Sequence, residues 1–325
     1  MDKLAQYQNC FLEYLEQNTG IVPPENLYKP ISYILNLGGK RIRPILTLMG
    51  ADIFGSTPEE ALPAALAIEI FHNFSLVHDD IMDTAPLRRG KETVHTKWNT
   101  NTAILSGDAM LIQAYQSFEA YEPQLFCKLV TLFSKTSLEV CEGQQYDVDF
   151  ETRNNVTEEE YLHMITNKTA VLVGAAFQMG AIIADRDKIE QKAIYDFGKL
   201  LGLAFQLQDD YLDAFGDPET FGKQVGGDII ENKKTYLYLK TLELSDKNQK
   251  LELEQLFSKK YTKGTIEKIV RAKELFEITG AANATKNAIE EYTQRAFSKI
   301  NLLAITEENK QLLHDFGTYL MNRRV

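Results

Sequence analysis

Residues 58–83 read PEEALPAALAIEIFHNFSLVHDDIMD. Apolar side chains recur along this stretch at intervals of three and four residues, the period of an α-helix that buries one face. Thr57 and Pro58 supply a cap and a first-turn proline, and Pro86 follows the end of the pattern. The stretch therefore predicts one long, apolar helix whose last turn carries aspartates.

The same helical period continues through most of the chain, and runs of alternating β-branched residues are missing. Strands are therefore not needed. No long Gly, Ser or Pro linker divides the sequence. We predict a single all-α domain over residues 1–325, a helical bundle. Its further helices are expected near residues 4–16, 102–121, 123–149, 157–183, 187–216, 228–243, 247–258, 264–300 and 306–321.

Composition excludes several classes of protein. The net charge is −11, with 46 acidic against 35 basic residues, whereas proteins that bind nucleic acid usually carry a basic excess. The three cysteines form no C-x-x-C pair, which argues against a disulfide framework or a zinc site and favours a reducing compartment. We found neither a signal peptide nor a charge-free apolar run of about 18 residues. A cytoplasmic protein without a membrane span is predicted.

A first acid cluster, Asp79, Asp80 and Asp83, ends the apolar helix of residues 58–83. Its first and last carboxylates are four residues apart and so share one helix face, where like charges repel. Burial of part of this cluster would add a further cost. A divalent cation would relieve both problems, and oxygen ligands on rigid helices suit magnesium. For this cluster alone, a solvated helix end with no ligand remains an equal alternative.

A second acid cluster repeats the spacing at Asp209, Asp210 and Asp213, and Asp217 extends it by one turn. Gln206 lies three residues before it on a similar face. Two such clusters at the ends of apolar helices favour opposing walls of one cavity. Together they would hold several magnesium ions over a diphosphate.

Basic residues lie close to the acid clusters in the sequence. Lys40 and Arg43 follow a pair of glycines, and Arg88 and Arg89 follow the first acid cluster after a short loop. Arginine suits bidentate recognition of phosphate, and lysine makes a point-charge contact. Each basic pair alone is typical of a solvated surface. Beside two acid clusters, they indicate two anions, one held by metal ions and one held directly by basic side chains.

Other polar residues carry weaker signals. Lys168 and Thr169 lie inside an apolar helix, so the lysine must reach solvent or find a partner. His72 lies two turns before Asp79, which is equally consistent with a core histidine and with a ligand contact. Lys223 and Lys233 follow the second acid cluster, and spacing alone does not distinguish them from surface charge.

Six motifs occur in an order that resembles the trans-isoprenyl diphosphate synthases, or polyprenyl synthetases, over roughly residues 30–240. They are GGKRIRP, LVHDDIMD, PLRRG, GQQYD, NKTA and FQLQDDYLDAFGD. The resemblance implies an all-α fold around a deep central cavity and a homodimer. It also implies magnesium, about three ions per active site, with manganese as an alternative metal.

The resemblance further implies a role for individual residues. Asp79, Asp80 and Asp83 resemble the first aspartate-rich motif of the family, and Asp209, Asp210 and Asp213 the second, both metal-binding. The contacts to isopentenyl diphosphate are matched by Lys40, Arg43, His72 and Arg89. The contacts to the allylic diphosphate are matched by Arg88, Lys168, Lys223 and Lys233. Thr169 and Gln206 match residues that face the developing carbocation, and Gln144 and Asp147 match polar cavity residues.

The implied reaction is an ionisation, condensation and elimination. An allylic diphosphate (dimethylallyl, geranyl or farnesyl) ionises, and the double bond of isopentenyl diphosphate attacks the cation. Metal ions and cationic side chains stabilise the departing diphosphate, and the apolar pocket excludes water. Asp79, Asp80, Asp83, Lys168, Thr169, Gln206 and Asp209 are the residues expected to act in catalysis. Each cycle adds five carbons.

Product length is expected to depend on the helix before the first acid cluster. Phe74 lies five residues before Asp79, where an aromatic side chain in this family stops chain growth early, and Phe71 lies one turn further. Ser75 departs from the double-aromatic pattern of many farnesyl synthases. We predict a product of fifteen to twenty carbons, geranylgeranyl rather than farnesyl diphosphate. The alternative is that Phe74 only packs in the core.

Two other functions remain open on the sequence. A class I terpene cyclase shares the fold and one acid motif, but it needs no isopentenyl site and has a different second metal motif. A non-catalytic subunit of a heteromeric prenyl synthase often lacks some of the aspartates, whereas this chain keeps all six. An activity assay on the purified chain separates these alternatives.

Overall fold

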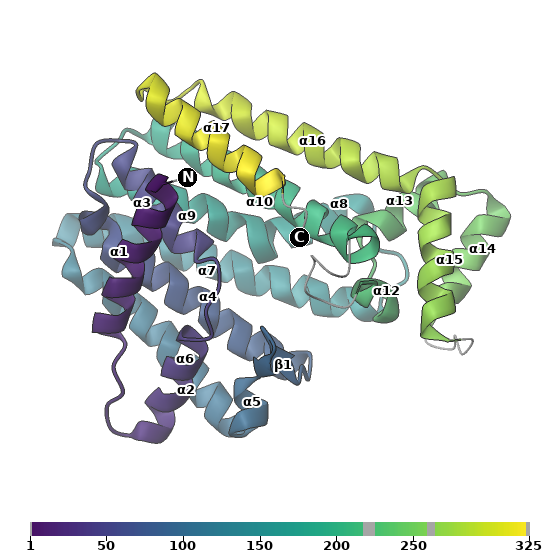
Figure 1. Ribbon diagram of the computed structural model, residues 1–325, viewed down its shortest axis with the longest axis horizontal. Helices are drawn as coiled ribbons and strands as arrows, with labels where there is room; N and C mark the ends of the chain where they lie inside the picture. The colour runs from purple at the N-terminus through teal and green to yellow at the C-terminus, as the bar shows by residue number, and fades with distance from the viewer. Residues whose placement is uncertain (1, 217–224, 259–263, 323–325) are drawn as a thin grey trace. The chain divides into compact units, whose positions relative to one another are not determined.

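The computed structural model describes residues 2–216, 225–258 and 264–322. The chain forms two compact units: residues 1–137 with 175–195, and residues 138–174 with 196–325. Helices make up nearly all of the regular structure, so the all-α prediction is confirmed (Figure 1). The assignment of residues 1–325 to a single domain stays a prediction.

The first unit contains the N-terminal helices. Its elements are α1 (Asp2–Asn18), α2 (Glu25–Leu35), α3 (Ile42–Asp52), η1 (Pro58–Ala61), α4 (Leu62–Met82), α5 (Val94–Lys97), α6 (Thr100–Gln116) and η2 (Ser117–Ala120), with strands β1 (Leu87–Arg88) and β2 (Lys91–Glu92). Parts of α7 (Pro123–Thr152), α9 (Val171–Ile183) and α10 (Lys188–Phe215) belong to this unit and continue into the second.

The helix predicted over residues 58–83 is the core of the first unit. A capping box at Thr57 and a 3₁₀ turn open it, and α4 follows to Met82. This helix packs against α3 and α6 and buries most of its side chains, including Phe71 and Ile68. Among the described residues, Pro58–Met82 is also the one helical stretch with the length and apolar composition of a membrane span, and 67% of its apolar 18-residue segment is buried inside the protein.

The second unit contains α8 (Glu158–Ile165), the π-helical turn η3 (Thr166–Ala170), α12 (Gly227–Ile230), α13 (Tyr236–Leu244), α14 (Lys247–Leu256), α15 (Thr265–Ile278), α16 (Ala281–Ile300) and α17 (Glu307–Met321). Its core joins side chains of α8, α10, α13, α14 and α15, among them Leu207, Leu275 and Phe276, all fully or almost fully buried.

The structure corrects several sequence-based boundaries. The expected helix at 264–300 is two helices, because Gly280 adopts a left-handed φ of 85° that ends α15 and precedes α16. The expected helix at 228–243 is likewise split into α12 and α13. The π-helical turn η3 interrupts the helix expected at 157–183. Helices α2 and α3 were not predicted.

The expectation that the chain needs no strands was wrong in one place. β1 and β2 form a two-residue antiparallel hairpin, in which Leu87 pairs with Glu92 and Arg88 with Lys91. Arg89 and Gly90 form its turn with φ values of 52° and 74°, the left-handed pair that tight hairpin turns require. The hairpin follows the first acid cluster and carries both arginines of PLRRG.

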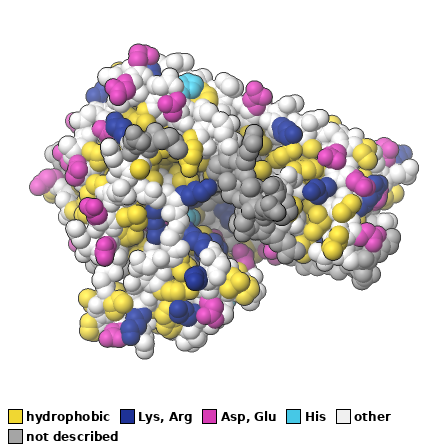
Figure 2. All heavy atoms as spheres, in the orientation of Figure 1, with side chains coloured by type: hydrophobic (Ala, Val, Ile, Leu, Met, Phe, Trp, Pro, Cys, Tyr) yellow, Lys and Arg dark blue, Asp and Glu magenta, His cyan; other side chains and the backbone are white. Residues whose placement is uncertain are grey.

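The acidic surplus is not gathered into one patch on the face drawn in Figure 2. Basic and acidic side chains are interspersed there, with small groups of hydrophobic side chains between them.

Candidate active site

The first acid cluster lies at the end of α4 and in the residue that follows. Asp80 is fully buried, and both of its carboxylate oxygens accept hydrogen bonds from Nε of Arg88, at 2.8 and 2.9 Å. Nη2 of Arg88 lies 2.7 Å from Asp80 Oδ1. Asp79 is half-buried and Asp83 exposed. The Asp79 and Asp83 carboxylates are therefore the more accessible ones for a metal ion, while Asp80 anchors the hairpin through Arg88.

A cluster of cations lies beside α4 in the same unit. Nη1 of Arg43 donates to Nε2 of His72, 3.1 Å away. Arg89 donates to the carbonyl of Gly38, and its guanidinium would lie 2.9 Å from a Cβ at Gly39. The φ of 123° at Gly39 favours glycine there. Burial lowers the pKa of Arg43 and of Arg89, and neighbouring arginines lower both further. Like charges held this close together, with Arg43 half-buried and Arg89 exposed, suit the binding of an anion.

A buried network that the sequence did not reveal supports this cluster. Arg41 and Glu69 form an ion pair whose side chains are each 3% exposed, and Arg41 also donates to the carbonyl of Leu35. Asn73 donates to Glu69 Oε1 at 3.0 Å. Arg41 has a left-handed φ of 49°, so the network fixes an otherwise unfavourable backbone conformation between Lys40 and Arg43. An acid in the middle of the apolar α4 pattern was the one available signal.

The charge of His72 gives a testable pH dependence. Burial and nearby arginines, first among them Arg43, hold the pKa of His72 well below its ordinary value near 6.5. Below about pH 6.5 the unfolded chain therefore binds a proton that the folded chain does not. As the pH decreases below about 6.5, the contribution of His72 should lower the free energy of unfolding by up to about 1.4 kcal/mol per pH unit.

In His72→Asn this contribution is absent, so the stability of the variant should fall less steeply than that of the wild type between pH 6.5 and 5. Urea unfolding of both proteins across this range measures the two slopes. Equal slopes would show that His72 is protonated as readily in the folded protein as in the unfolded chain.

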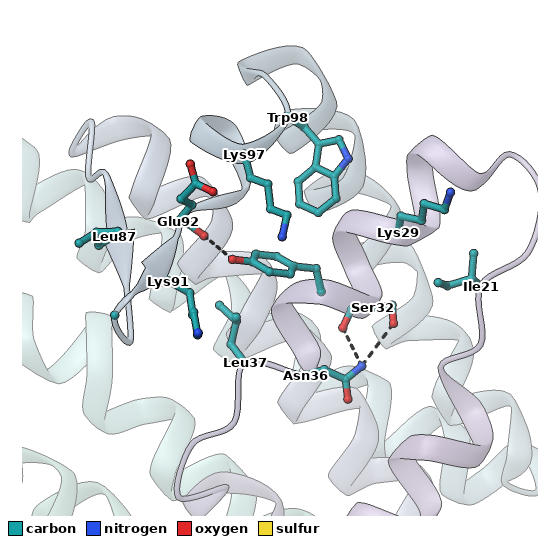
Figure 3. Close-up of a pocket in the computed structure, with 12 residues that line it drawn as sticks. Ile21, Lys29, Ser32, Asn36, Leu37, Leu87, Lys91, Glu92, Lys97 and Trp98 are labelled. Carbon is teal, nitrogen blue, oxygen red and sulfur yellow. Dashed lines mark hydrogen bonds between the residues drawn. The ribbon is translucent and has the colours of Figure 1, made fainter.

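Tyr33 of α2 holds the hairpin through a hydrogen bond. The Tyr33 hydroxyl donates to the carbonyl of Glu92 at 2.8 Å, and the Lys97 ammonium lies 4.1 Å from the centre of the Tyr33 ring. These residues and Trp98 line a groove of about 800 Å³ (Figure 3). None of the residues predicted for catalysis or substrate binding lines it.

The second unit brings together several predicted residues. Lys168 and Thr169 lie in the π-helical turn η3, and π-helical turns often occur at functional sites. Lys168 Nζ contacts Asp147 Oδ2 at 2.5 Å, so of the two alternatives for this lysine, solvent or a partner, the structure shows a partner. Gly143 on α7 makes room for the turn, since a Cβ there would collide with the Lys168 backbone. The Thr169 hydroxyl donates to Gln206 Oε1 at 3.2 Å.

The second acid cluster shows the same division of roles as the first. Asp210 is 5% exposed and accepts hydrogen bonds from the Tyr161 hydroxyl and from Gln206 Nε2, the latter at 3.1 Å. Burial raises the pKa of Asp210 well above its usual range. Asp209 is half-buried. Tyr161 was not predicted, because a tyrosine at an apolar position of a helix is usually only a core residue.

Asp213 joins this cluster to α12. Its Oδ2 accepts the backbone N–H of Asp228 at 3.0 Å. Burial, followed by the charge of Asp228, raises the pKa of Asp213 to about 6. The Asp228 carboxylate in turn lies 3.4 Å from Lys233 Nζ. Lys233 therefore contacts Asp228 beside this cluster, and its role toward the allylic diphosphate stays a prediction. Asp228 is a neighbour of the cluster that the sequence did not reveal.

The remaining predicted residues have diverse surroundings. Lys40 is exposed on the loop before α3, and Gln144 Oε1 is buried without a hydrogen-bond partner.

The Phe74 ring packs on Phe71 and His78, at centroid distances of 5.6 and 4.7 Å. The Ser75 hydroxyl donates to the carbonyl of His72 at 2.9 Å. Lys223 and Asp217 lie outside the described residues.

Comparison with known proteins decides the family. A sequence profile of the polyprenyl synthetase family matches residues 24–273. The chain belongs to this family. It is a short-chain trans-prenyltransferase with the all-α isoprenoid synthase fold, and the family and reaction class expected from the six motifs are confirmed.

Individual relatives match the sequence of this prenyltransferase over nearly the whole chain. A geranylgeranyl diphosphate synthase of Methanosarcina mazei is 38% identical over 305 residues, 93% of this chain and 91% of its own. A crystal structure of a geranylgeranyl pyrophosphate synthase has 57% identity and a TM-score of 0.94, over 99% of each chain. That of Pyrococcus horikoshii has 32% identity and a TM-score of 0.91, over 99% of this chain and 98% of its own. A terpene cyclase is no longer the competing interpretation.

Proposed function

We propose that this prenyltransferase is a geranylgeranyl diphosphate synthase. It would extend dimethylallyl, geranyl and farnesyl diphosphate with isopentenyl diphosphate and release the twenty-carbon product. The observation that carries the proposal is the 57% identity over 99% of the chain to a solved geranylgeranyl pyrophosphate synthase. The presence of Phe74 before the first acid cluster is consistent with a short-chain product.

The carboxylates suit magnesium as the metal that binds with the allylic diphosphate. Asp79 and Asp83 offer oxygen ligands one turn apart, and Asp209 and Asp213 repeat that spacing. Among the described residues, no three Asp, Glu, His or Cys side chains converge enough to hold an ion by themselves. Magnesium commonly keeps several waters and takes further ligands from substrate phosphates, which such a donor set permits. Manganese would suit the same oxygens.

Asp80 and Asp210 take a different part in the proposal. The contacts of Asp80 with Arg88, and of Asp210 with Tyr161 and Gln206, occupy their carboxylate oxygens. The sequence places both residues among the metal ligands. The proposal instead gives them the role of holding neighbouring side chains in position. The proposal assigns direct metal binding to Asp79, Asp83, Asp209 and Asp213, for about three ions per active site.

The cation cluster of the first unit would bind the diphosphate of isopentenyl diphosphate. Arg43 is fixed through His72, and Arg89 through the carbonyl of Gly38. Lys40 lies two residues after Gly38 on the same loop. Because His72 is neutral, it accepts from Arg43 and leaves the other guanidinium N–H groups to donate to phosphate.

The polar residues of the second unit would act on the allylic substrate. The ammonium of Lys168, Lys223 and Lys233 would neutralise charge on the departing diphosphate. The hydroxyl of Thr169 and the amide oxygen of Gln206, tied together at 3.2 Å, would face the allylic cation with their negative dipole ends. Bound metal ions add charge stabilisation to the leaving group. The departed diphosphate is the proposed base for the final proton.

An assay on the purified chain tests the proposal. Dimethylallyl, geranyl and farnesyl diphosphate are each supplied with labelled isopentenyl diphosphate and Mg²⁺, and the products are separated by length. Geranylgeranyl diphosphate should be the main product from all three primers. No turnover by the chain alone would favour the non-catalytic subunit, and a main product of fifteen or of more than twenty carbons would refute the assigned length.

Replacing Phe74 should lengthen the product. Phe74 is 9% exposed, and its truncation to alanine opens space beside α4 toward Phe71. If Phe74 is the floor of the chain-binding tunnel, Phe74→Ala should make products of twenty-five carbons or more in the same assay. Phe54→Ala is the matched control, because Phe54 lies in the same unit and is also 9% exposed. Unchanged length in Phe74→Ala would mean that Phe74 only packs in the core.

The proposal includes a homodimer that works in the cytoplasm. Leu105 and Ile112 lie seven residues apart on one face of α6 and are 60% and 59% exposed. Exposed apolar side chains on one helix face are typical of an interface with a second chain. None of the three cysteines forms a disulfide, which suits a reducing compartment. The mass in solution, measured by light scattering, tests the dimer.

A further inference from the structure

Lys268 on α15 is a buried lysine that no motif of the sequence includes. It is 6% exposed. Its ammonium donates to the carbonyls of Ile229 and Ile230, at 2.5 and 3.2 Å, and to Asn232 Oδ1 at 2.7 Å. Three donors thus meet three oxygens. A buried ammonium group is costly unless its N–H groups are hydrogen-bonded, and these three oxygens meet that requirement.

These oxygens belong to the end of α12. Ile229 and Ile230 are its last residues, and Asn232 follows with a left-handed φ of 60°. A positive charge at the carboxyl end of a helix is favourable. Ile269, the neighbour of Lys268, packs against Gly226 at the other end, where a Cβ would lie 2.8 Å from Ile269 Cγ1. Two consecutive residues of α15 therefore hold both ends of α12.

α12 in turn holds groups of the second acid cluster. The N–H of Gly226 donates to the Asp213 carbonyl at 2.6 Å, and the N–H of Asp228 donates to Asp213 Oδ2 at 3.0 Å. The Asp228 carbonyl accepts the N–H of Lys233 at 2.9 Å. A displacement of α12 would consequently move the Asp213 carboxylate and Lys233 together.

We propose that Lys268 is a positioning residue for the second acid cluster: it fixes α12, and α12 orients Asp213 and Lys233 for the allylic diphosphate and its metal ions. This inference rests on the proposed function, which gives those two side chains their ligand. The ammonium of Lys268 is occupied by these protein oxygens, so its assigned role is positioning and not contact with substrate or metal. It would act through the carbonyls at the end of α12 and through the side chain of Asn232, which follows this helix.

Lys268→Met tests the inference, since methionine keeps an unbranched apolar stem and removes all three donors. Hydrogen exchange of residues 225–235 should become faster in the variant, with or without metal. The Kd for Mn²⁺ in the presence of inorganic diphosphate, measured by electron paramagnetic resonance, should rise at least ~10-fold, the usual range for a lost outer-shell partner. The KM for the allylic diphosphate should rise, and that for isopentenyl diphosphate should not.

Two further variants keep the test decisive. Arg271→Met lies on the same helix and loses ion pairs with Glu252 and Glu274; it should lower stability without changing the Mn²⁺ Kd. Asn232→Gly removes one acceptor, suits the left-handed φ, and should give a smaller change in the same direction as Lys268→Met. If Lys268→Met does not fold, Asn232→Gly decides.

The inference and the proposed function fail in different ways. A folded Lys268→Met with unchanged exchange at residues 225–235 and an unchanged Mn²⁺ Kd overturns the inference while the wild type still makes product. A wild type that makes no geranylgeranyl diphosphate overturns the proposed function, whatever the exchange experiment shows.

Discussion

Asp79→Asn should lower kcat by roughly 10³-fold, the scale expected when one preorganised electrostatic contact to a leaving group is lost. Asparagine keeps the size of the side chain but removes its charge, so magnesium would lose one carboxylate ligand at the accessible end of α4. The KM for isopentenyl diphosphate should change little, because the cation cluster around Arg43 is untouched. Steady-state kinetics with both substrates measures this.

Asp80→Asn provides the informative contrast. Asp80 is fully buried against Arg88, so under the proposed assignment its replacement removes an ion pair and not a metal ligand. We expect a loss of stability and a smaller loss of kcat than in Asp79→Asn. Glu13→Gln, at an exposed position of α1, should behave as wild type. If Asp80→Asn weakened Mg²⁺ binding as much as Asp79→Asn with no change in stability, Asp80 would be a ligand after all.

The helical architecture could be predicted because one physical signal dominates this chain. A 3.6-residue apolar period marks α4, α10 and most other helices, since each must bury one face. The signal fails where a short element depends on backbone conformation. The hairpin at Leu87–Glu92 rests on left-handed Arg89 and Gly90, and the break after α15 on Gly280. Neither is visible in an apolar period.

The candidate site divides in a similar way. Charged residues that cluster in the sequence, such as Asp79 and Asp209, could be found because like charges at helical spacing need an explanation. Residues that act through a distant partner could not. Glu69 and Arg41 are 28 positions apart, and Tyr161 and Asp210 are 49. Only the folded chain shows that these polar side chains meet.

The function of the Arg41–Glu69 pair can be tested through its energetics. Both side chains are 3% exposed, so removing one charge leaves the other buried and unpaired. Glu69→Gln should lower the free energy of unfolding by about 3–5 kcal/mol, as measured for broken buried ion pairs. Urea unfolding measures this. Glu291→Gln, which breaks an exposed pair with Arg295, should cost at most about 0.5 kcal/mol.

A double variant separates stability from substrate binding. Buried ion pairs are often replaced by apolar residues with little loss of stability, so Arg41→Met with Glu69→Leu should recover most of what Glu69→Gln loses. The KM of the double variant for isopentenyl diphosphate should nevertheless be higher than that of the wild type. Without the contacts of Arg41 to Glu69 and to the Leu35 carbonyl, the left-handed turn between Lys40 and Arg43 is no longer fixed. A stable double variant with a wild-type KM would show that the pair contributes only to folding.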